Sequence, residues 1–332
     1  TAGASWDDVG RLCQGWGKRH GEAGCLYFLG ERAFHARDYE KASAYYEQLT
    51  QLALNLGDLG TLDMLAQLRL GETRRMQGDY GQARNLLERA GANLREIGSF
   101  YELRALACLA RLDLYLGDAA GAWQRLAKLG AGTTPPPLSD VMSFALLTQA
   151  LLALQRGEPE QAVFHAAAAR HLQQAAGNPY DEAATLIIMG HAAAAAVRWA
   201  EAQAAYTQAV RLAETLNIRD LAAEGHAGLA NVAACTGDSA TALVHAEAIL
   251  ALLAEQQRVG LDEPFFTYLA CYRVLAAAHD VRAHGVLAQG HAHLMAYAGH
   301  IEDEALRESF LGNVAEHREL RELHMRLKLL TG

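Results

Sequence analysis

The sequence contains few of the residues that disfavour α-helices. Only 6 of its 332 residues are proline, aromatic residues account for 7%, and β-branched residues are scarce beside Ala and Leu. Ala and Leu are strong helix formers, so this composition favours an all-helical protein.

Features of several other protein classes are also missing. The net charge is −9, which argues against a surface that binds nucleic acid. No apolar run reaches the roughly 18–20 residues of a membrane span, and nothing resembles a signal peptide. We therefore expect a cytoplasmic protein with no membrane partner and no direct nucleic-acid partner.

The cysteines are scattered, odd in number and without a C-x-x-C pair. They are Cys13, Cys25, Cys108, Cys235 and Cys271. Reduced, mostly buried thiols fit this distribution better than a disulfide framework does.

Motifs of nucleotide-dependent, hydrolytic and zinc enzymes are absent as well. The sequence contains no G-x-x-x-x-G-K-[ST], no G-x-S-x-G and no H-E-x-x-H, and no G-x-G-x-x-G opens a helix after a strand. We therefore predict no enzyme activity, no catalytic residues and no bound cofactor or metal.

What the sequence does contain is a column of alanines spaced 39–41 residues apart over most of its length. The column consists of Ala42, Ala83, Ala122, Ala162, Ala202, Ala242 and Ala283. A fixed period of this size indicates a stacked array of repeats.

Two further columns follow the same period. Twelve residues before each alanine stands a small residue: Gly30, Gly71, Ala110, Ala150, Gly190, Ala230 or Cys271. Four residues after it stand Tyr46, Leu87, Leu126, Ala166, Tyr206, Ala246 and Leu287. Between each small residue and the following column alanine lies a turn signal, such as Gly78-Asp79 or Gly237-Asp238. These pairs indicate a turn because Gly ends a helix and Asp caps the next one. Each unit is therefore predicted to be a helix, a tight turn and a second helix, which approach closely where side chains are short.

This pattern of small, large and small residues resembles that of the tetratricopeptide repeat family over roughly residues 20–300. The period of about 40 is longer than the usual 34 of that family. Such long repeats, together with the tail that contains Ile301-Glu302-Asp303-Glu304, look like the C-terminal sensor regions of bacterial signalling ATPases of the STAND type and of maltose-activator-like transcription regulators.

The resemblance implies an all-α, right-handed α-solenoid that forms a single domain over residues 1–332. We expect a partial repeat over residues 1–20, seven repeats over 21–300 and a capping helix over 301–332. Two longer connections interrupt the array, and the second ends in Asp262-Glu263-Pro264, which is typical of a helix start. The chain begins at Thr1 rather than Met, so we expect it to be part of a longer protein.

In this family the first helices line the concave groove, and the residue after each small residue faces it. Down the array these residues are Glu31, Glu72, Arg111, Leu151, His191, Asn231 and Tyr272, flanked by Tyr27, Arg104, Phe144, Glu224, Phe265 and Tyr268. As ligand-binding candidates we select Glu31, Glu72, Arg104, Arg111, His191, Asn231, Phe265, Tyr268 and Tyr272. The alternative is that they are solvated inner-face residues, and that the aromatic residues pack against the terminal helix.

We expect a non-enzymatic sensor or scaffold region of a larger cytoplasmic regulator. It would bind a protein, a peptide or a small effector in the groove and act on an upstream ATPase or output module. A free-standing peptide receptor is one alternative. A metal-dependent enzyme is another, since nine of fourteen histidines fall in the last third of the chain, His284, His291, His293 and His300 among them. Catalysis by Cys271 with His279 is less favoured, because both occupy packing or turn positions.

Overall fold

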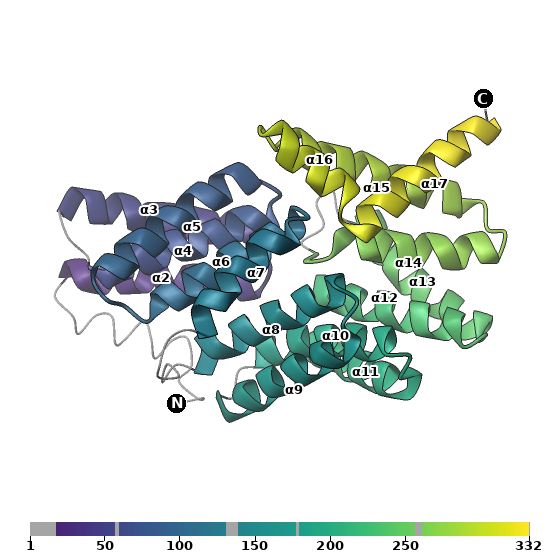
Figure 1. Ribbon diagram of the computed structural model, residues 1–332, viewed down its shortest axis with the longest axis horizontal. Helices are drawn as coiled ribbons and strands as arrows, with labels where there is room; N and C mark the ends of the chain where they lie inside the picture. The colour runs from purple at the N-terminus through teal and green to yellow at the C-terminus, as the bar shows by residue number, and fades with distance from the viewer. Residues whose placement is uncertain (1–17, 57–59, 131–138, 177–178, 256–260, 332) are drawn as a thin grey trace.

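The repeats predicted from the alanine column are present as helix pairs in the computed structural model (Figure 1). The structure describes residues 18–56, 60–130, 139–176, 179–255 and 261–331, which form sixteen helices and no strands. The predicted partial repeat lies outside the described residues except for positions 18–20, which begin the first helix. The predicted all-α solenoid of about seven repeats is confirmed.

The first helix of each pair forms the inner layer of the array. The inner helices are α2 (Lys18–His35), α4 (Thr61–Met76), α6 (Tyr101–Tyr115), α8 (Ser139–Gln155), α10 (Pro179–Ala195), α12 (Arg219–Cys235) and α14 (Pro264–Ala277). The outer helices are α3 (Tyr39–Leu56), α5 (Tyr80–Glu96), α7 (Ala119–Gly130), α9 (Pro159–Ala176), α11 (Trp199–Thr215), α13 (Ser239–Glu255) and α15 (Arg282–Gly299).

The columns of small residues mark the crossings between inner and outer helices. All seven alanines of the column are at most 3% exposed. A Cβ atom at Gly71 would come within 2.7 Å of the Leu87 side chain, and one at Gly190 within 2.3 Å of the Tyr206 ring. The inner helices approach this closely because those positions carry no side chain.

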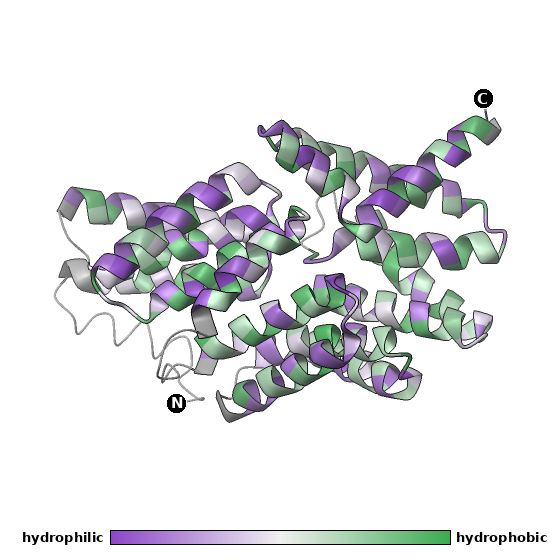
Figure 2. Cartoon of the chain, in the orientation of Figure 1, coloured by the Kyte–Doolittle hydropathy of each residue, from purple (hydrophilic) through white to green (hydrophobic). Residues whose placement is uncertain are grey.

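Apolar contacts hold neighbouring pairs together, and hydrophobic and hydrophilic residues interleave along the helices in Figure 2. One buried cluster joins distant parts of the chain. It includes Tyr80 at the start of α5 and Phe310 near the C-terminus, whose ring centroids are 5.6 Å apart. None of the helices in the described part is both long enough and apolar enough to cross a membrane.

The C-terminal cap consists of two helices, α16 (Glu304–Gly312) and α17 (Ala315–Thr331), where the sequence pattern predicted one. The last carbonyl groups of α16 accept hydrogen bonds from Arg318 (3.1 Å, Gly312 O) and Arg321 (3.2 Å, Leu311 O), so the break leaves them satisfied. Asn313, at the break, donates to the carbonyl of Gly117 in the α6–α7 turn (3.2 Å). The cap therefore contacts the third repeat as well as the last, and the array curves back on itself.

Every turn within a repeat contains one residue with positive φ. Four of these residues are glycines, and the others are Arg37, Val197 and His279. Val197 has φ 60°, which crowds its branched side chain against the backbone.

We expect Val197→Gly to raise the free energy of unfolding by about 1 kcal/mol, because glycine adopts this conformation without strain. Little packing is lost, since Val197 is 65% exposed. Urea unfolding measures the change. The matched control is Val244→Gly, 68% exposed inside α13, which should destabilise by about 0.5 kcal/mol. Destabilisation by both substitutions would contradict the assignment of strain to Val197.

Candidate functional site

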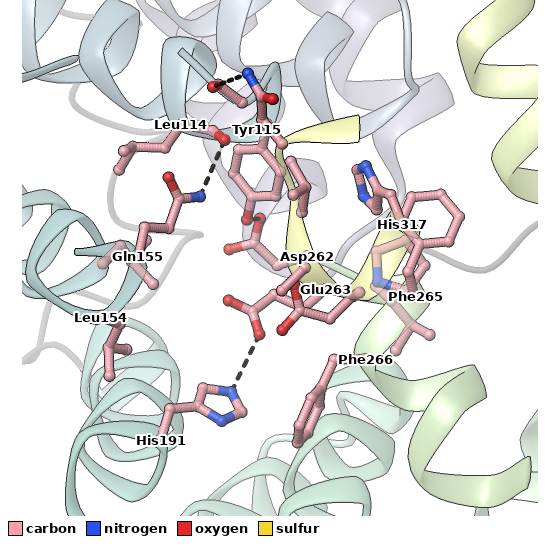
Figure 3. Close-up of a pocket in the computed structure, with 18 of the residues that line it drawn as sticks. Leu114, Tyr115, Leu154, Gln155, His191, Asp262, Glu263, Phe265, Phe266 and His317 are labelled. Carbon is pink, nitrogen blue, oxygen red and sulfur yellow. Dashed lines mark hydrogen bonds and ion pairs between the residues drawn. The ribbon is translucent and has the colours of Figure 1, made fainter. Parts of the chain in front are cut away.

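A cavity of about 620 Å³ lies on the concave side of the array, where the middle repeats meet the C-terminal cap. Its walls come from the end of α6, from α8 and α10, from the segment that leads into α14, and from the junction of α16 and α17 (Figure 3). Leu114, Leu154 and Phe266 make parts of these walls apolar. We call this space the larger cavity.

His191 lies on one wall of the larger cavity between two polar partners. Its Nε2 atom is 3.2 Å from a carboxylate oxygen of Glu263, and its Nδ1 atom is 2.8 Å from the Tyr206 hydroxyl. Tyr206 reaches this position because its ring lies over Gly190, which has no side chain. The imidazole and the Phe266 ring pack in a T-shaped arrangement with centroids 4.8 Å apart. Burial opposes protonation of His191, but the Glu263 carboxylate outweighs burial and raises the pKa of this histidine.

The larger cavity carries more negative than positive charge. Glu263 and Glu316 both line it, and burial raises the pKa of Glu316, with a further contribution from the charge of Glu263. His191 is the group that faces these two carboxylates. Asp262 and Arg75 also line the cavity, but their charges cancel because Arg75 Nη1 lies 2.9 Å from Asp262 Oδ1. The cavity is thus suited to a ligand that has a basic group beside an apolar part.

Ion pairs between residues far apart in sequence close the array across its concave side. Asp262 accepts hydrogen bonds from Arg75 of α4 (2.9 Å) and from the Tyr115 hydroxyl of α6 (2.7 Å). Glu224 of α12 accepts one from Arg37, which follows α2 (2.7 Å), and one from the backbone N–H of Asp262 (2.5 Å). We call these five residues the inner belt.

The two acids of the inner belt, Asp262 and Glu224, have pKa values shifted in opposite directions. Burial disfavours the charge of Asp262, but Arg75, Arg111 and Arg37 together outweigh burial and hold its pKa well below the ordinary value. Burial and the neighbouring charge of Asp262 raise the pKa of Glu224 to about 7. Asp262 is therefore the permanent negative charge at the centre of the array.

A second, smaller cavity of about 100 Å³ shares Arg75 and Asp262 with the larger one. Glu72 lies in its wall and pairs with Arg69 (2.8 Å) and Arg104 (3.2 Å). The guanidinium groups of Arg104 and Arg111 lie 3.7 and 4.0 Å from the ring centroid of Phe144. The inner belt thus separates a cavity with acidic character from one rich in arginine.

His317 lies at the start of α17, between aromatic side chains. Its ring centroid is 4.6 Å from that of Phe265 and 4.2 Å from that of Phe310, and its Nδ1–H donates to the Phe310 carbonyl at 2.6 Å. The residue is 3% exposed, and burial lowers its pKa to about 4. It is therefore a neutral histidine at neutral pH.

Known proteins resemble this chain in structure only. No family model matches the sequence, and no curated protein does either. A STAND protein with a tetratricopeptide repeat sensor from Pyrococcus horikoshii matches over 97% of this chain and 53% of its own, at a TM-score of 0.59 and 13% identity. The fold is that of a tetratricopeptide-repeat superhelix.

Two other solved structures have the same superhelix. The Cut9–Hcn1 structure matches over 82% of this chain and 46% of its own, with a TM-score of 0.58 and 18% identity. A Rap protein in complex with Competence and Sporulation Factor matches over 93% of this chain and 98% of its own, with a TM-score of 0.54 and 13% identity. The chain thus spans about half the length of the STAND and Cut9 chains, and nearly all of the Rap chain.

The nine ligand-binding candidates selected from the sequence do not share one site: they lie in the larger cavity, in the smaller cavity, in an ion pair outside both, and in the core. The larger cavity is lined by His191, Asn231 and Phe265, and the smaller one by Glu72, Arg104 and Arg111. Glu31 lines neither; it pairs with Arg69 at 2.5 Å and accepts a hydrogen bond from Tyr46. Tyr268 is 1% exposed in the core, and Tyr272 packs against the same core cluster.

Four residues that shape the cavities were not among the sequence candidates: Asp262, Glu263, Glu316 and His317. The first two were interpreted only as the start of a helix. Two adjacent acidic residues directly after Leu261 and before the helix-starting Pro264 are the signal that was available for them. No periodic signal marks Glu316 and His317, because they lie beyond the last repeat.

Four of the nine histidines of the last third form two contacting pairs. His226 and His245 have their Nδ1 atoms 3.1 Å apart, and the rings of His291 and His324 stack at 3.9 Å. Within the described part of the chain, no three or more His, Cys, Asp or Glu side chains form a group that could hold a metal ion.

Replacing Asp262 by Asn should destabilise the protein by about 3 kcal/mol, because Arg75 keeps its buried charge and loses the matching one. Urea unfolding measures the loss, and small-angle scattering should detect a larger radius of gyration as the inner belt opens. The control is Glu247→Gln, which removes an exposed carboxylate paired with Arg282 and should have a much smaller effect on stability. Equal effects of the two substitutions would contradict the role of the inner belt.

His317 should make stability fall in acid. Its pKa is lower in the folded than in the unfolded chain, so its contribution is complete above about pH 6.5 and is lost as the pH falls towards 4. His317→Asn, which keeps an N–H donor for Phe310 but does not titrate, should reduce that loss by about 3 kcal/mol. Denaturant unfolding at several pH values tests this. The exposed His284→Asn is the control and should keep the wild-type slope; a wild-type slope in His317→Asn would refute the assignment.

Proposed function

We propose that this chain is a non-enzymatic binding protein whose larger cavity holds a peptide segment or small effector with a basic group next to an apolar one. The observation that carries the proposal is the larger cavity itself, about 620 Å³ in volume, with the carboxylates of Glu263 and Glu316 set among aromatic side chains. This volume falls within the range of about 300–1,000 Å³ that is typical of ligand pockets.

The larger cavity is well placed for a sensing role, because separate parts of the chain meet around it. Three separate parts of the chain bound it: the middle repeats through His191, the segment before α14 through Glu263, and the cap through Glu316. A ligand that contacts all three favours the closed arrangement over an open one. Occupancy then shifts the equilibrium between two states of the superhelix, as signalling requires.

We further propose that the chain is the sensor or scaffold region of a larger cytoplasmic regulator, with an ATPase or another output module upstream. The similarity to a STAND protein with a tetratricopeptide repeat sensor supports this context, and this chain covers 53% of that structure. The Rap structure in complex with Competence and Sporulation Factor supports a binding role for a superhelix of this kind.

A free-standing peptide receptor is the second candidate, because the chain covers 98% of the Rap chain. The full reading frame separates the two candidates. A nucleotide-binding module upstream of Thr1 favours the signalling ATPase, whereas an open reading frame that encodes no such module favours the receptor.

Selection of random heptapeptides displayed on phage against the purified chain tests the larger cavity without a known ligand. We expect enrichment of peptides with Arg or Lys beside an aromatic or aliphatic residue. A synthesised peptide from the selection should bind Glu263→Gln and Glu316→Gln about 10-fold or more weakly than wild type in calorimetry. Exposed Glu247→Gln is the control and should bind normally. Selection of acidic peptides, or equal affinity for all variants, would contradict the proposal.

A further inference from the structure

Arg111, on the inner helix α6, is a buried cation with no hydrogen-bonded carboxylate in the described part of the chain. The residue is 6% exposed and lines the smaller cavity. Among the described residues, no acceptor lies within hydrogen-bond distance of its Nε and Nη2 atoms. Its guanidinium carbon lies over the face of Phe144, 4.0 Å from the ring centroid. A buried charge in this state is unfavourable unless a counter-charge joins it.

The other buried arginines around the smaller cavity all have a carboxylate partner. The pairs are Arg37–Glu224, Arg69–Glu31, Arg75–Asp262 and Arg104–Glu72. Burial alone lowers the pKa of an arginine, and in these four the carboxylate outweighs burial and raises it. In Arg111 burial prevails and lowers the pKa. Arg111 is thus the positive charge that remains after the other four are paired.

The acids in the wall of the smaller cavity are engaged elsewhere. Glu72 accepts hydrogen bonds from Arg69 and Arg104, and Asp262 accepts them from Arg75 and Tyr115. Asp140 is exposed to solvent, and the charge of half-buried Asp181 acts on Arg104. None of these carboxylates forms a hydrogen bond or ion pair with Arg111; Asp262 acts on it only through its charge, which is already paired with Arg75. The Arg111 guanidinium therefore keeps hydrogen-bond donors for an anion from outside the chain.

The space beside Arg111 suits a small ion. A volume of about 100 Å³ has room for a small polyatomic anion and excludes a folded partner. The planar fork of a guanidinium matches two oxygen atoms of one carboxylate or phosphate. Neighbouring Arg104, on the same helix and near the same Phe144 ring, adds to the positive potential there.

We propose that the smaller cavity is a binding site for a small oxyanion, a carboxylate or a phosphate group, held by the Arg111 guanidinium. The Arg75–Asp262 pair lies in the walls of both cavities and forms the partition between them. The anion site is therefore separate from the larger cavity and does not depend on a ligand in the larger cavity. Bound anion supplies the missing counter-charge and stabilises the closed superhelix.

Thermal unfolding in acetate, phosphate and chloride at equal pH and ionic strength tests the site. At about 20 mM anion, wild-type Tm should rise by about 3 °C over chloride in acetate, in phosphate or in both. A response to acetate alone identifies a carboxylate site, and a response to phosphate alone identifies a phosphate site. No response to either anion overturns the proposal.

Arg111→Met separates the site from general salt effects. Methionine removes the unpaired charge and keeps an apolar contact with Phe144, so in chloride this variant should have a Tm equal to or above that of wild type. Its Tm should not respond to acetate or phosphate. A rise in Tm with acetate or phosphate equal to that of wild type, or a Tm in chloride below that of wild type, would show that Arg111 does not bind the anion.

Two further variants complete the test. Arg69→Met removes a paired arginine of the same cavity and should lower the Tm in chloride, unlike Arg111→Met. Arg111→Lys keeps the charge but loses the planar fork, so calorimetry should show affinity for the effective anion reduced about 10-fold. If Arg111→Lys binds the anion as tightly as wild type, recognition by the guanidinium fork is refuted.

Discussion

The close approach of each inner helix to its outer partner is the constraint on which the rest of the structure depends. Where a glycine stands at the crossing, in α2, α4 and α10, a large side chain from the outer helix fills the gap, as Tyr206 does over Gly190. Because one tyrosine both packs the crossing and places its hydroxyl on His191, the packing of a repeat also orients a side chain of the larger cavity.

Closure of the array adds a second level of organisation. A simple solenoid has contacts only between neighbouring repeats. This chain joins α4 and the turn after α2 to α12 and the segment before α14 through buried ion pairs, and it joins α6 to that segment through a tyrosine hydrogen bond. Buried ion pairs are costly to desolvate, so they contribute specificity more than stability. Asp262 and Glu224 define one closed arrangement, and the two cavities lie on either side of that closure.

Charge is divided between the two cavities by the same closure. In the larger cavity the carboxylates of Glu263 and Glu316 outnumber the one histidine that faces them, His191, and in the smaller cavity the Arg111 guanidinium has no hydrogen-bonded carboxylate among the described residues. Neither imbalance is visible in the net charge of the chain, because local pairing, and not composition, decides which charges are left over. The two proposed ligand chemistries, one basic and one anionic, follow from that local arrangement.

The sequence by itself determined the repeats, their register and the turn positions, because helix packing imposes small residues at a fixed period. It also indicated that the inner helices carry polar residues, which include His191, Arg104 and Arg111. Only the tertiary structure decided which of these residues share a cavity and which, like Tyr268, lie in the core. Asp262, Glu263, Glu316 and His317 escaped prediction for the same reason. They lie outside the periodic columns, and a contact such as Arg75–Asp262, between residues 187 positions apart, leaves no periodic signal in a single sequence.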